Sequence, residues 1–124
     1  MPVRVLVADD NLDVHELVND ILLINFKDVT VDRALDVDGL RARLGSAQPP
    51  YNLVIAASNL AGSAGDALVS ILSSEFPGYL DKVVILEDVL GRTSAGAAAA
   101  IIPILKKPFS LDDFGDCIRR ICPP

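Results

Sequence analysis

Carboxylates and a lysine stand at two places in this sequence where they could bind a cation or take part in phosphoryl transfer. Asp9 and Asp10 are adjacent and follow an apolar run, while Lys107 precedes Pro108 near the end of the 124-residue chain. Two carboxylates about 4 Å apart repel by about 4 kcal/mol at an effective dielectric of about 20, so a cation beside them is favourable. A hard divalent ion or a lysine ammonium would supply that charge. The simpler alternative is a pair of solvated acids at a helix N-terminus.

The middle of the chain lacks the carboxylate that would complete such a site. An apolar run at 53–57 ends in Ala57 and is followed by Ser58 and Asn59, and no Asp or Glu occurs from residue 52 to residue 65. A carboxylate nucleophile for phosphoryl transfer is therefore missing from this segment. Ser58 is a weak alternative acceptor, because neighbouring strand residues face opposite sides of a sheet.

The composition favours one globular domain over residues 1–124. The chain is 51% apolar and 23% charged, which fits a packed core. A net charge of −6 argues against a nucleic-acid partner, and no apolar run is long enough for a membrane span. The N-terminus lacks the pattern of a signal peptide, and Cys117 and Cys122 do not form a CxxC pair. We therefore expect a cytoplasmic protein with reduced thiols, and with no nucleic acid or membrane among its partners.

Apolar periodicity alternates between strand and helix along the chain. Strands are predicted at 3–8, 28–32, 53–57, 83–86 and 101–105, and helices at 14–22, 37–44, 67–72, 91–100 and 111–121. Such alternation predicts an α/β fold, a doubly wound parallel sheet with helices on both faces. Pro103 cannot donate a ladder hydrogen bond and so places the last strand at an edge. The sequence thus predicts a flavodoxin-like five-stranded sheet in the order 2-1-3-4-5.

Ligands of doubly wound folds bind outside the carboxyl ends of the strands. In this sequence the polar residues at those ends are Asp9, Asp10, Ser58, Asn59, Glu87, Asp88, Lys106 and Lys107. These residues should therefore gather at one edge of the sheet. His15 lies one step from the apolar stripe of the first helix, and we expect it at the surface.

Three segments of this edge together resemble the receiver domain of two-component response regulators. They are residues 5–11, 59–65 and 107–109, which include Asp9-Asp10-Asn11 and Lys107-Pro108-Phe109. The resemblance covers the whole chain and implies a CheY-like fold. It also implies that Asp9, Asp10 and the backbone carbonyl of Asn59 hold Mg²⁺, that residue 57 is the phosphoacceptor position, and that Lys107 contacts the phosphoryl group.

The departures from the receiver pattern fall on the switch positions. Ala57 stands where the resemblance implies the phosphoaccepting Asp, Glu87 where it implies Thr or Ser, and Ile104 where it implies an aromatic residue. Several departures together favour natural divergence over a single engineered change at Ala57. Mg²⁺ binding should be weak, since one anionic ligand is lost. Glu87 could reach Lys107 and replace the missing anion, and the alternative is a Glu87 carboxylate in solvent.

The expected function is that of a pseudo-receiver in a two-component phosphorelay, a protein-interaction module that works without phosphorylation and is not an enzyme. Its expected partner is a histidine kinase or a downstream effector, bound through the 91–121 face, which could also form a homodimer. The alternative is a conventional receiver whose acceptor Asp is mutated to Ala57 or replaced by another residue. A small-molecule sensor that uses the space at Ala57 has no positive residue signal.

Overall fold

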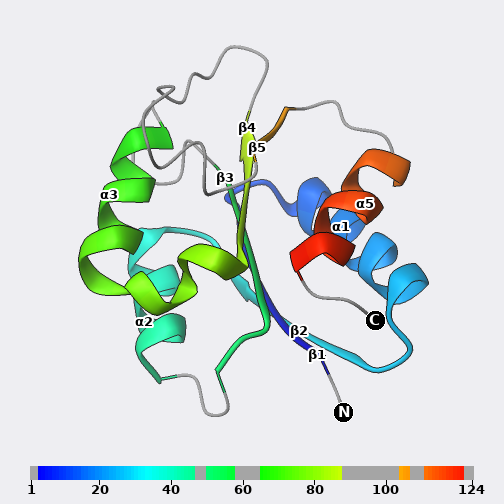
Figure 1. Ribbon diagram of the computed structural model, residues 1–124, viewed down its shortest axis with the longest axis horizontal. Helices are drawn as coiled ribbons and strands as arrows, with labels where there is room; N and C mark the ends of the chain where they lie inside the picture. Colours follow the sequence, from blue (N-terminus) through cyan, green and yellow to red (C-terminus); the bar gives the residue numbers. More distant parts are fainter. Residues whose placement is uncertain (1–2, 47–49, 58–64, 88–103, 107–110, 122–124) are drawn as a thin grey trace.

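The computed structural model describes residues 3–46, 50–57, 65–87, 104–106 and 111–121, which form a parallel sheet flanked by helices (Figure 1). In chain order the elements are β1 (Val3–Ala8), α1 (Leu12–Asn25), β2 (Val29–Ala34), α2 (Val37–Ser46), β3 (Leu53–Ala57), α3 (Gly65–Glu75), the 3-10 helix η1 (Pro77–Lys82), β4 (Val83–Glu87), β5 (Ile104–Lys106) and α5 (Leu111–Ile121). Pro103 and the predicted helix at 91–100 lie outside the described residues. None of the described helices is long and apolar enough to cross a membrane.

The sheet has the order β2-β1-β3-β4-β5, and every pair of neighbouring strands is parallel. β1 pairs with β2 on one side and with β3 on the other. The order of β2, β1, β3 and β4, with their parallel pairing, confirms the predicted flavodoxin-like α/β fold. β5 contributes three residues, which pair with β4 from Ile85↔Ile104 to Glu87↔Lys106.

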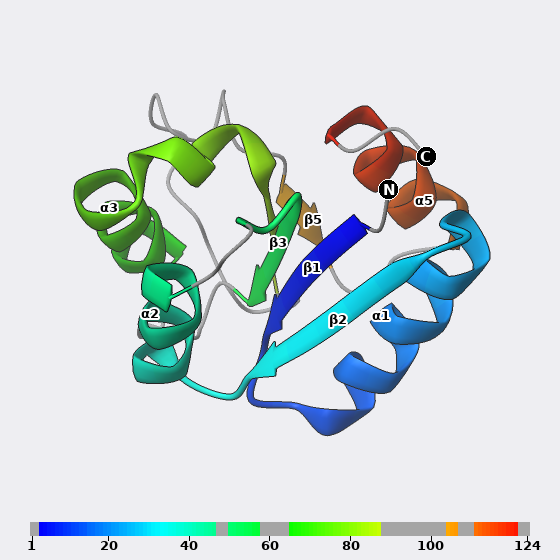
Figure 2. The same ribbon diagram turned by 90° about the horizontal axis from the view of Figure 1, so that it is seen from below.

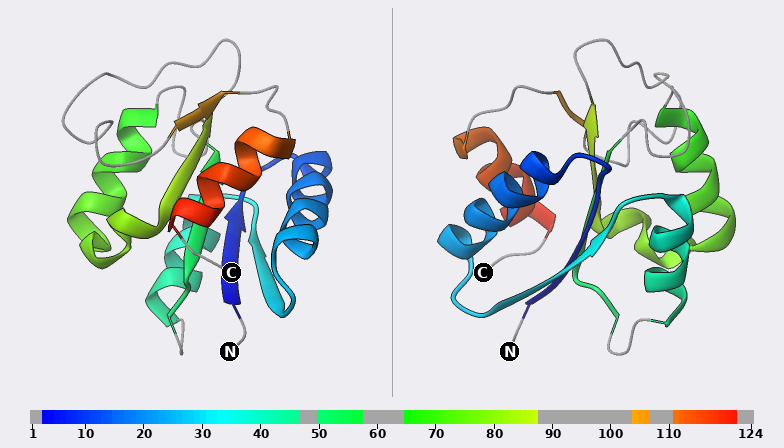
Figure 3. Two further views of the ribbon diagram at one scale, coloured as in Figure 1. Left: turned by 45° about the vertical axis from the view of Figure 1, so that its right-hand side comes forward. Right: turned by 180° about the vertical axis from the view of Figure 1, so that it is seen from behind.

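Two apolar layers cover the two faces of the sheet, which is why its strands are nearly unbroken apolar runs. α1 and α5 lie on one face, and α2 and α3 lie on the other (Figures 2 and 3). Alternate residues separate accordingly, with Val5 and Ile55 in the α1/α5 layer and Leu6 and Val54 in the α2/α3 layer. Each of these side chains is 0% exposed. Burial on both faces fixes the register, because a one-residue slip would exchange the two layers.

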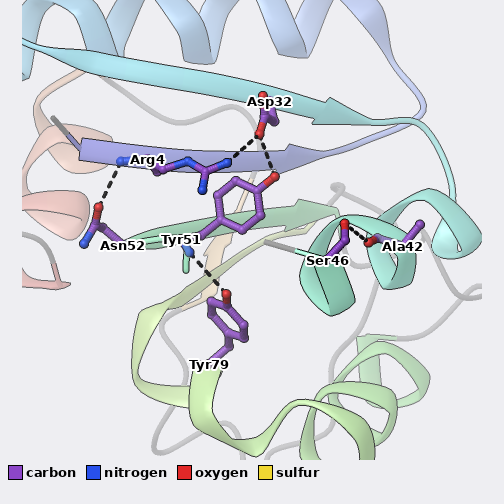
Figure 4. Close-up of polar contacts among 7 residues, drawn as sticks. All are labelled: Arg4, Asp32, Ala42, Ser46, Tyr51, Asn52 and Tyr79. Atoms are coloured by element: carbon purple, nitrogen blue, oxygen red, sulfur yellow. Dashed lines mark hydrogen bonds and ion pairs between the residues drawn. The ribbon is translucent and has the colours of Figure 1, made fainter. Parts of the chain in front are cut away.

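Tyr51 joins three strands and η1 just before β3 begins (Figure 4). Its hydroxyl donates to Asp32 Oδ2 of β2 at 2.6 Å, and its backbone N–H donates to the Tyr79 hydroxyl oxygen of η1 at 3.1 Å. Arg4 of β1 lies over the Tyr51 ring, 5.0 Å from its centroid, and its guanidinium approaches Asp32 at 3.5 Å. Burial, with the hydrogen bond and charge of Asp32, raises the pKa of Tyr51 to about 12. This cluster ties the edge strand β2 to the interior of the sheet.

Tyr51→Phe should lower the free energy of unfolding by about 1–2 kcal/mol near neutral pH, since the buried hydroxyl bonds a carboxylate. This difference should shrink as the pH rises from about 10 towards 12, because the unfolded tyrosine ionises near 10.0 and the folded one near 12. A group whose pKa is higher in the folded state than in the unfolded state stabilises the fold at pH values below its unfolded pKa. This stabilisation is lost as the pH rises through the folded pKa. Urea unfolding of both proteins at about pH 8 and about pH 11 measures both effects.

Glu75→Gln is the matched control for this substitution. Glu75 forms an exposed ion pair with Arg41 at 2.8 Å, in which both side chains are 41% exposed. Such a pair contributes at most about 1 kcal/mol and should contribute equally at about pH 8 and about pH 11. Two outcomes would contradict the role given to Tyr51. One is that Tyr51→Phe lowers the free energy of unfolding no more than Glu75→Gln does, and the other is that its effect stays constant to about pH 11.

Candidate functional site

The carboxyl ends of the strands meet at one edge of the sheet, where the sequence places the candidate residues. The last paired residues of β1 and β3 are Ala8 and Ala56, so Asp9 and Ala57 come next along these two neighbouring strands. Glu87 ends β4 and pairs with β5. The described backbone therefore brings all three positions to the same edge, the one at which doubly wound folds bind ligands.

Part of the predicted site lies outside the described residues. Asn59 and Lys107 fall there, as do Ser58 and Asp88, together with the side chains of Glu87 and Ile104. The contact of the Glu87 carboxylate with Lys107 therefore stays a prediction. The carbonyl ligand at Asn59 and the switch role of Ile104 stay predictions as well.

Asp9 is buried at this edge, whereas Asp10 is exposed. Asp9 is 1% exposed, and its backbone N–H donates to the Ala34 carbonyl at 3.0 Å. Its Oδ1 accepts the Asn11 N–H at 3.0 Å, and the Asn11 side chain caps α1 by accepting the Asp13 N–H at 2.9 Å. The two adjacent acids therefore lie in different surroundings, and water reaches one of them far more than the other.

The expectation of a surface histidine at residue 15 is wrong. His15 is 1% exposed, and its Nε2 lies 2.6 Å from the Asp9 carbonyl oxygen, an acceptor, so Nε2 carries a proton and donates. Its Nδ1 is buried and has no hydrogen-bond partner among the described residues. Helical side chains lean towards the N-terminus, which brings the ring back over the turn before α1. The overlooked signal is spacing, since His15, Val18 and Leu22 lie on one face of the helix.

Ala57 closes β3 with a buried methyl group. Its exposure is 0%, and strand alternation places it on the face that carries Leu53 and Ile55. A methyl group is neither a nucleophile nor an anionic ligand, so this position cannot accept a phosphoryl group. Among the side chains that the structure describes at this edge, the carboxylates are those of Asp9 and Asp10.

The described acids do not make a complete site for Mg²⁺. Magnesium requires octahedral coordination by oxygen, and the described residues at this edge offer it the carboxylates of Asp9 and Asp10. Oδ1 of Asp9 already accepts the Asn11 N–H. Within the described residues, no cluster of three or more His, Cys, Asp or Glu side chains could hold a metal ion. The described residues therefore supply two of the three predicted magnesium ligands, and the third, Asn59, lies outside them.

No family model matches the chain, and no curated protein matches it. The signal receiver domain of an HD domain-containing protein from Pseudomonas fluorescens Pf-5 matches with a TM-score of 0.73 at 18% identity, over 98% of this chain and 94% of that chain. The chemotaxis protein CheY4 of Vibrio cholerae matches with a TM-score of 0.71 at 20% identity, over 98% of this chain and 99% of that chain. A response regulator receiver domain protein from Bacillus halodurans C-125 matches with a TM-score of 0.69 at 18% identity, over 100% of both chains. The chain therefore has the CheY-like fold of receiver domains.

Replacing His15 with Leu should lower the free energy of unfolding by about 1–3 kcal/mol, because the change leaves the buried Asp9 carbonyl without this donor. The backbone amides of Asp10 and Asn11 should also exchange with solvent faster than the global loss of stability explains, since their turn loses a tie to α1. Urea unfolding and hydrogen exchange measure the two effects.

His15→Gln is the matched control, because its side-chain amide can donate to the same carbonyl and should recover part of the lost stability. Its Asp10 exchange rate should lie between those of the unchanged chain and His15→Leu. A His15→Leu protein as stable as the unchanged chain, with the same exchange at Asp10, would show that the ring merely fills space.

Proposed function

We propose that this protein is a receiver-like module of a two-component phosphorelay, which acts through protein contacts and is not itself phosphorylated. The observation that carries the proposal is Ala57, a buried methyl group at the carboxyl end of β3, on the strand next to that of Asp9. The fold, which this chain shares with the receiver domains of solved structures, supports a role in signalling.

Phosphoryl transfer to a protein needs a nucleophile placed in line with the phosphorus atom, and Ala57 has none. Asp9 is a poor substitute, because its Oδ1 accepts the Asn11 N–H and its backbone is held at both the N–H and the carbonyl. Without a phosphoryl group, nothing at residue 57 biases the fold between two conformations. The proposed module therefore presents a fixed surface to its partners.

The proposed partner is a protein of the same pathway, either a histidine kinase or a downstream effector, and the proposed contact includes the 91–121 face. Of this face the structure describes β5 and α5. α5 is held against α1 by Arg119, whose Nη1 donates to Asn25 Oδ1 at 2.7 Å. The exposed residues of α5 carry both charges; they are Asp112, Asp113, Asp116, Arg119 and Arg120. Homodimer formation through this face, a cytoplasmic location and weak Mg²⁺ binding belong to the same proposal.

A conventional phospho-accepting receiver is the second candidate, and the retained pair of Asp9 and Asp10 favours it. In that case the working protein has Asp at residue 57, or another side chain accepts the phosphoryl group. The two candidates differ in one measurable property, which is whether the present chain takes up phosphate.

Incubation with acetyl phosphate and Mg²⁺ should leave the mass of this chain unchanged, since Ala57 offers no nucleophile. Ala57→Asp should gain the mass of one phosphoryl group in the same intact-mass measurement. Asp9→Asn combined with Ala57→Asp is the control, and its gain should be smaller because the cation loses a carboxylate ligand. Phosphate uptake by the unchanged chain would overturn the proposal in favour of the conventional receiver.

Mg²⁺ should raise the melting temperature of Ala57→Asp more than that of the unchanged chain. The added carboxylate supplies another anionic oxygen, and a ligand that binds only the folded state stabilises it by about 2.7 kcal/mol at about 100 times its dissociation constant. Thermal unfolding with MgCl₂, compared with NaCl at the same ionic strength, separates binding from screening. Equal gains in both proteins would mean that the missing carboxylate is not what weakens the site.

A further inference from the structure

A hollow of about 650 Å³ adjoins the C-terminal end of α1. Its lining comes from the last turn of α1, the connection to β2 and the start of β1, which are residues 23–28 and Val3. The volume lies within the range of about 300–1,000 Å³ that is typical of small-molecule pockets. Because β1 begins at Val3, the hollow lies at the opposite end of the strands from Asp9 and Ala57. It is therefore separate from the phosphoacceptor edge.

The lining of the hollow offers apolar contact. Phe26 is 3% exposed and belongs to the apolar layer under α1, and Val3 packs against the same layer. Leu23 and Ile24, in contrast, are 58% and 75% exposed. A ligand that covers these two side chains removes apolar surface from water, which favours a ligand with an apolar body. The ring of Phe26 suits an aromatic one.

The polar groups of the hollow favour a cation. Asp28 is exposed, and no salt bridge engages it within the described part of the chain. α1 has no basic residue in its last turn. The Phe26 N–H donates to the Leu22 carbonyl, whereas the carbonyls of Leu23 and Ile24 accept no hydrogen bond from a described residue. Such a helix end carries a negative partial charge, so a positive head group is stabilised beside it.

Lys27 is the cation among these lining residues, and it is exposed. Its long side chain can keep the ammonium group in water, away from a ligand. The Asp28 carboxylate, the carbonyl end of α1 and the net charge of −6 oppose its effect. This balance disfavours an anionic ligand such as inorganic phosphate, and it also disfavours a second copy of the chain. Lys27 should weaken the binding of a cation, which makes its substitution informative.

We propose that the hollow binds a small organic amine, a molecule with an aromatic or branched apolar body and one ammonium group. The apolar body covers Leu23 and Ile24 and reaches Phe26. The ammonium group donates to the carbonyl end of α1 and lies beside the Asp28 carboxylate. The apolar contact supplies most of the affinity, and the charge selects an amine over an acid of the same shape.

Asn25 joins this amine site to α5. It lines the hollow, its Oδ1 accepts a hydrogen bond from Arg119 Nη1 at 2.7 Å, and its Nδ2 donates to the Ile21 carbonyl at 2.8 Å. α1 and α5 lie side by side (Figure 3). A ligand that contacts Asn25 should therefore alter the contact between the two helices. This link rests on the proposed function in one respect, which is that α5 belongs to the 91–121 face.

The test titrates phenethylammonium chloride into the full chain and follows backbone amides by NMR. Sodium 3-phenylpropionate and 2-phenylethanol carry the same body with a negative and a neutral head. At up to about 10 mM, enough to occupy a site with a dissociation constant of about 1 mM, the amine should shift amides of residues 23–28 and of residues 115–119. It should bind at least about threefold more tightly than the acid, with the alcohol between them, by a margin that falls as salt increases.

Substitutions in the lining should act in opposite directions. Asp28→Asn should weaken binding of the amine by about threefold, and Lys27→Gln should strengthen it by a similar factor, because each changes one exposed charge. Ile24→Ser should weaken binding of all three probes, since it removes apolar contact.

Asp81→Asn is the matched control for Asp28→Asn, because Asp81 is an exposed acid of η1, which packs in the other apolar layer. Leu35→Ser is the control for Ile24→Ser, since Leu35 is 52% exposed and lies outside the hollow. Both should leave the affinity for the amine unchanged.

Three results would each overturn the amine site: no shifts at residues 23–28, equal binding of amine and acid, or equal effects of Asp81→Asn and Asp28→Asn. Shifts at 23–28 without any at 115–119 would overturn the link to α5. Phosphate uptake is measured separately. A chain that takes up phosphate and still binds the amine refutes only the proposed function, and a chain that does neither refutes only the amine site.

Discussion

Burial of the central strands on both faces is the constraint on which the rest of this structure depends. Val5, Ile55 and Val84 fill one layer at 0% exposure, while the residues between them fill the other. A slip of one residue would exchange the layers, so packing alone fixes where β1 and β3 end relative to each other. Asp9 and Ala57 are therefore neighbours because of the core, before any chemistry is considered. What the edge can do then depends on which side chains occupy positions that the core has already set.

The same burial explains which parts of the fold could be predicted from the sequence. A strand buried on both faces has a local signature, a short apolar run, and the helices between have their own period. The Tyr51 cluster has no such signature, because its contacts from Arg4 to Asp32 and from Tyr51 to Tyr79 each join residues 28 positions apart. Nor was η1 predicted. Proline suits the first turn of a helix, which is where Pro77 lies, but one proline does not by itself distinguish a short helix from a turn.

Only those residues of the candidate site that directly follow a strand could be predicted from the sequence. Asp9, Asp10 and Ala57 could be placed by counting to the end of an apolar run. His15 could not, because its polarity suggests the surface, while an imidazole whose Nε2–H bonds a backbone carbonyl can pack in the core. The predicted contact of Glu87 with Lys107 depends on side-chain directions beyond the strands. Periodicity does not specify those directions.

The methyl group of Ala57 also changes the energetics of the edge. A carboxylate at this position would lie on the strand beside Asp9, and two carboxylates about 4 Å apart repel by about 4 kcal/mol at an effective dielectric of about 20. A working phosphoacceptor therefore depends on a cation, and that dependence couples the edge to phosphate chemistry. Ala57 avoids this additional repulsion, because its methyl group carries no charge, while the repulsion between Asp9 and Asp10 remains.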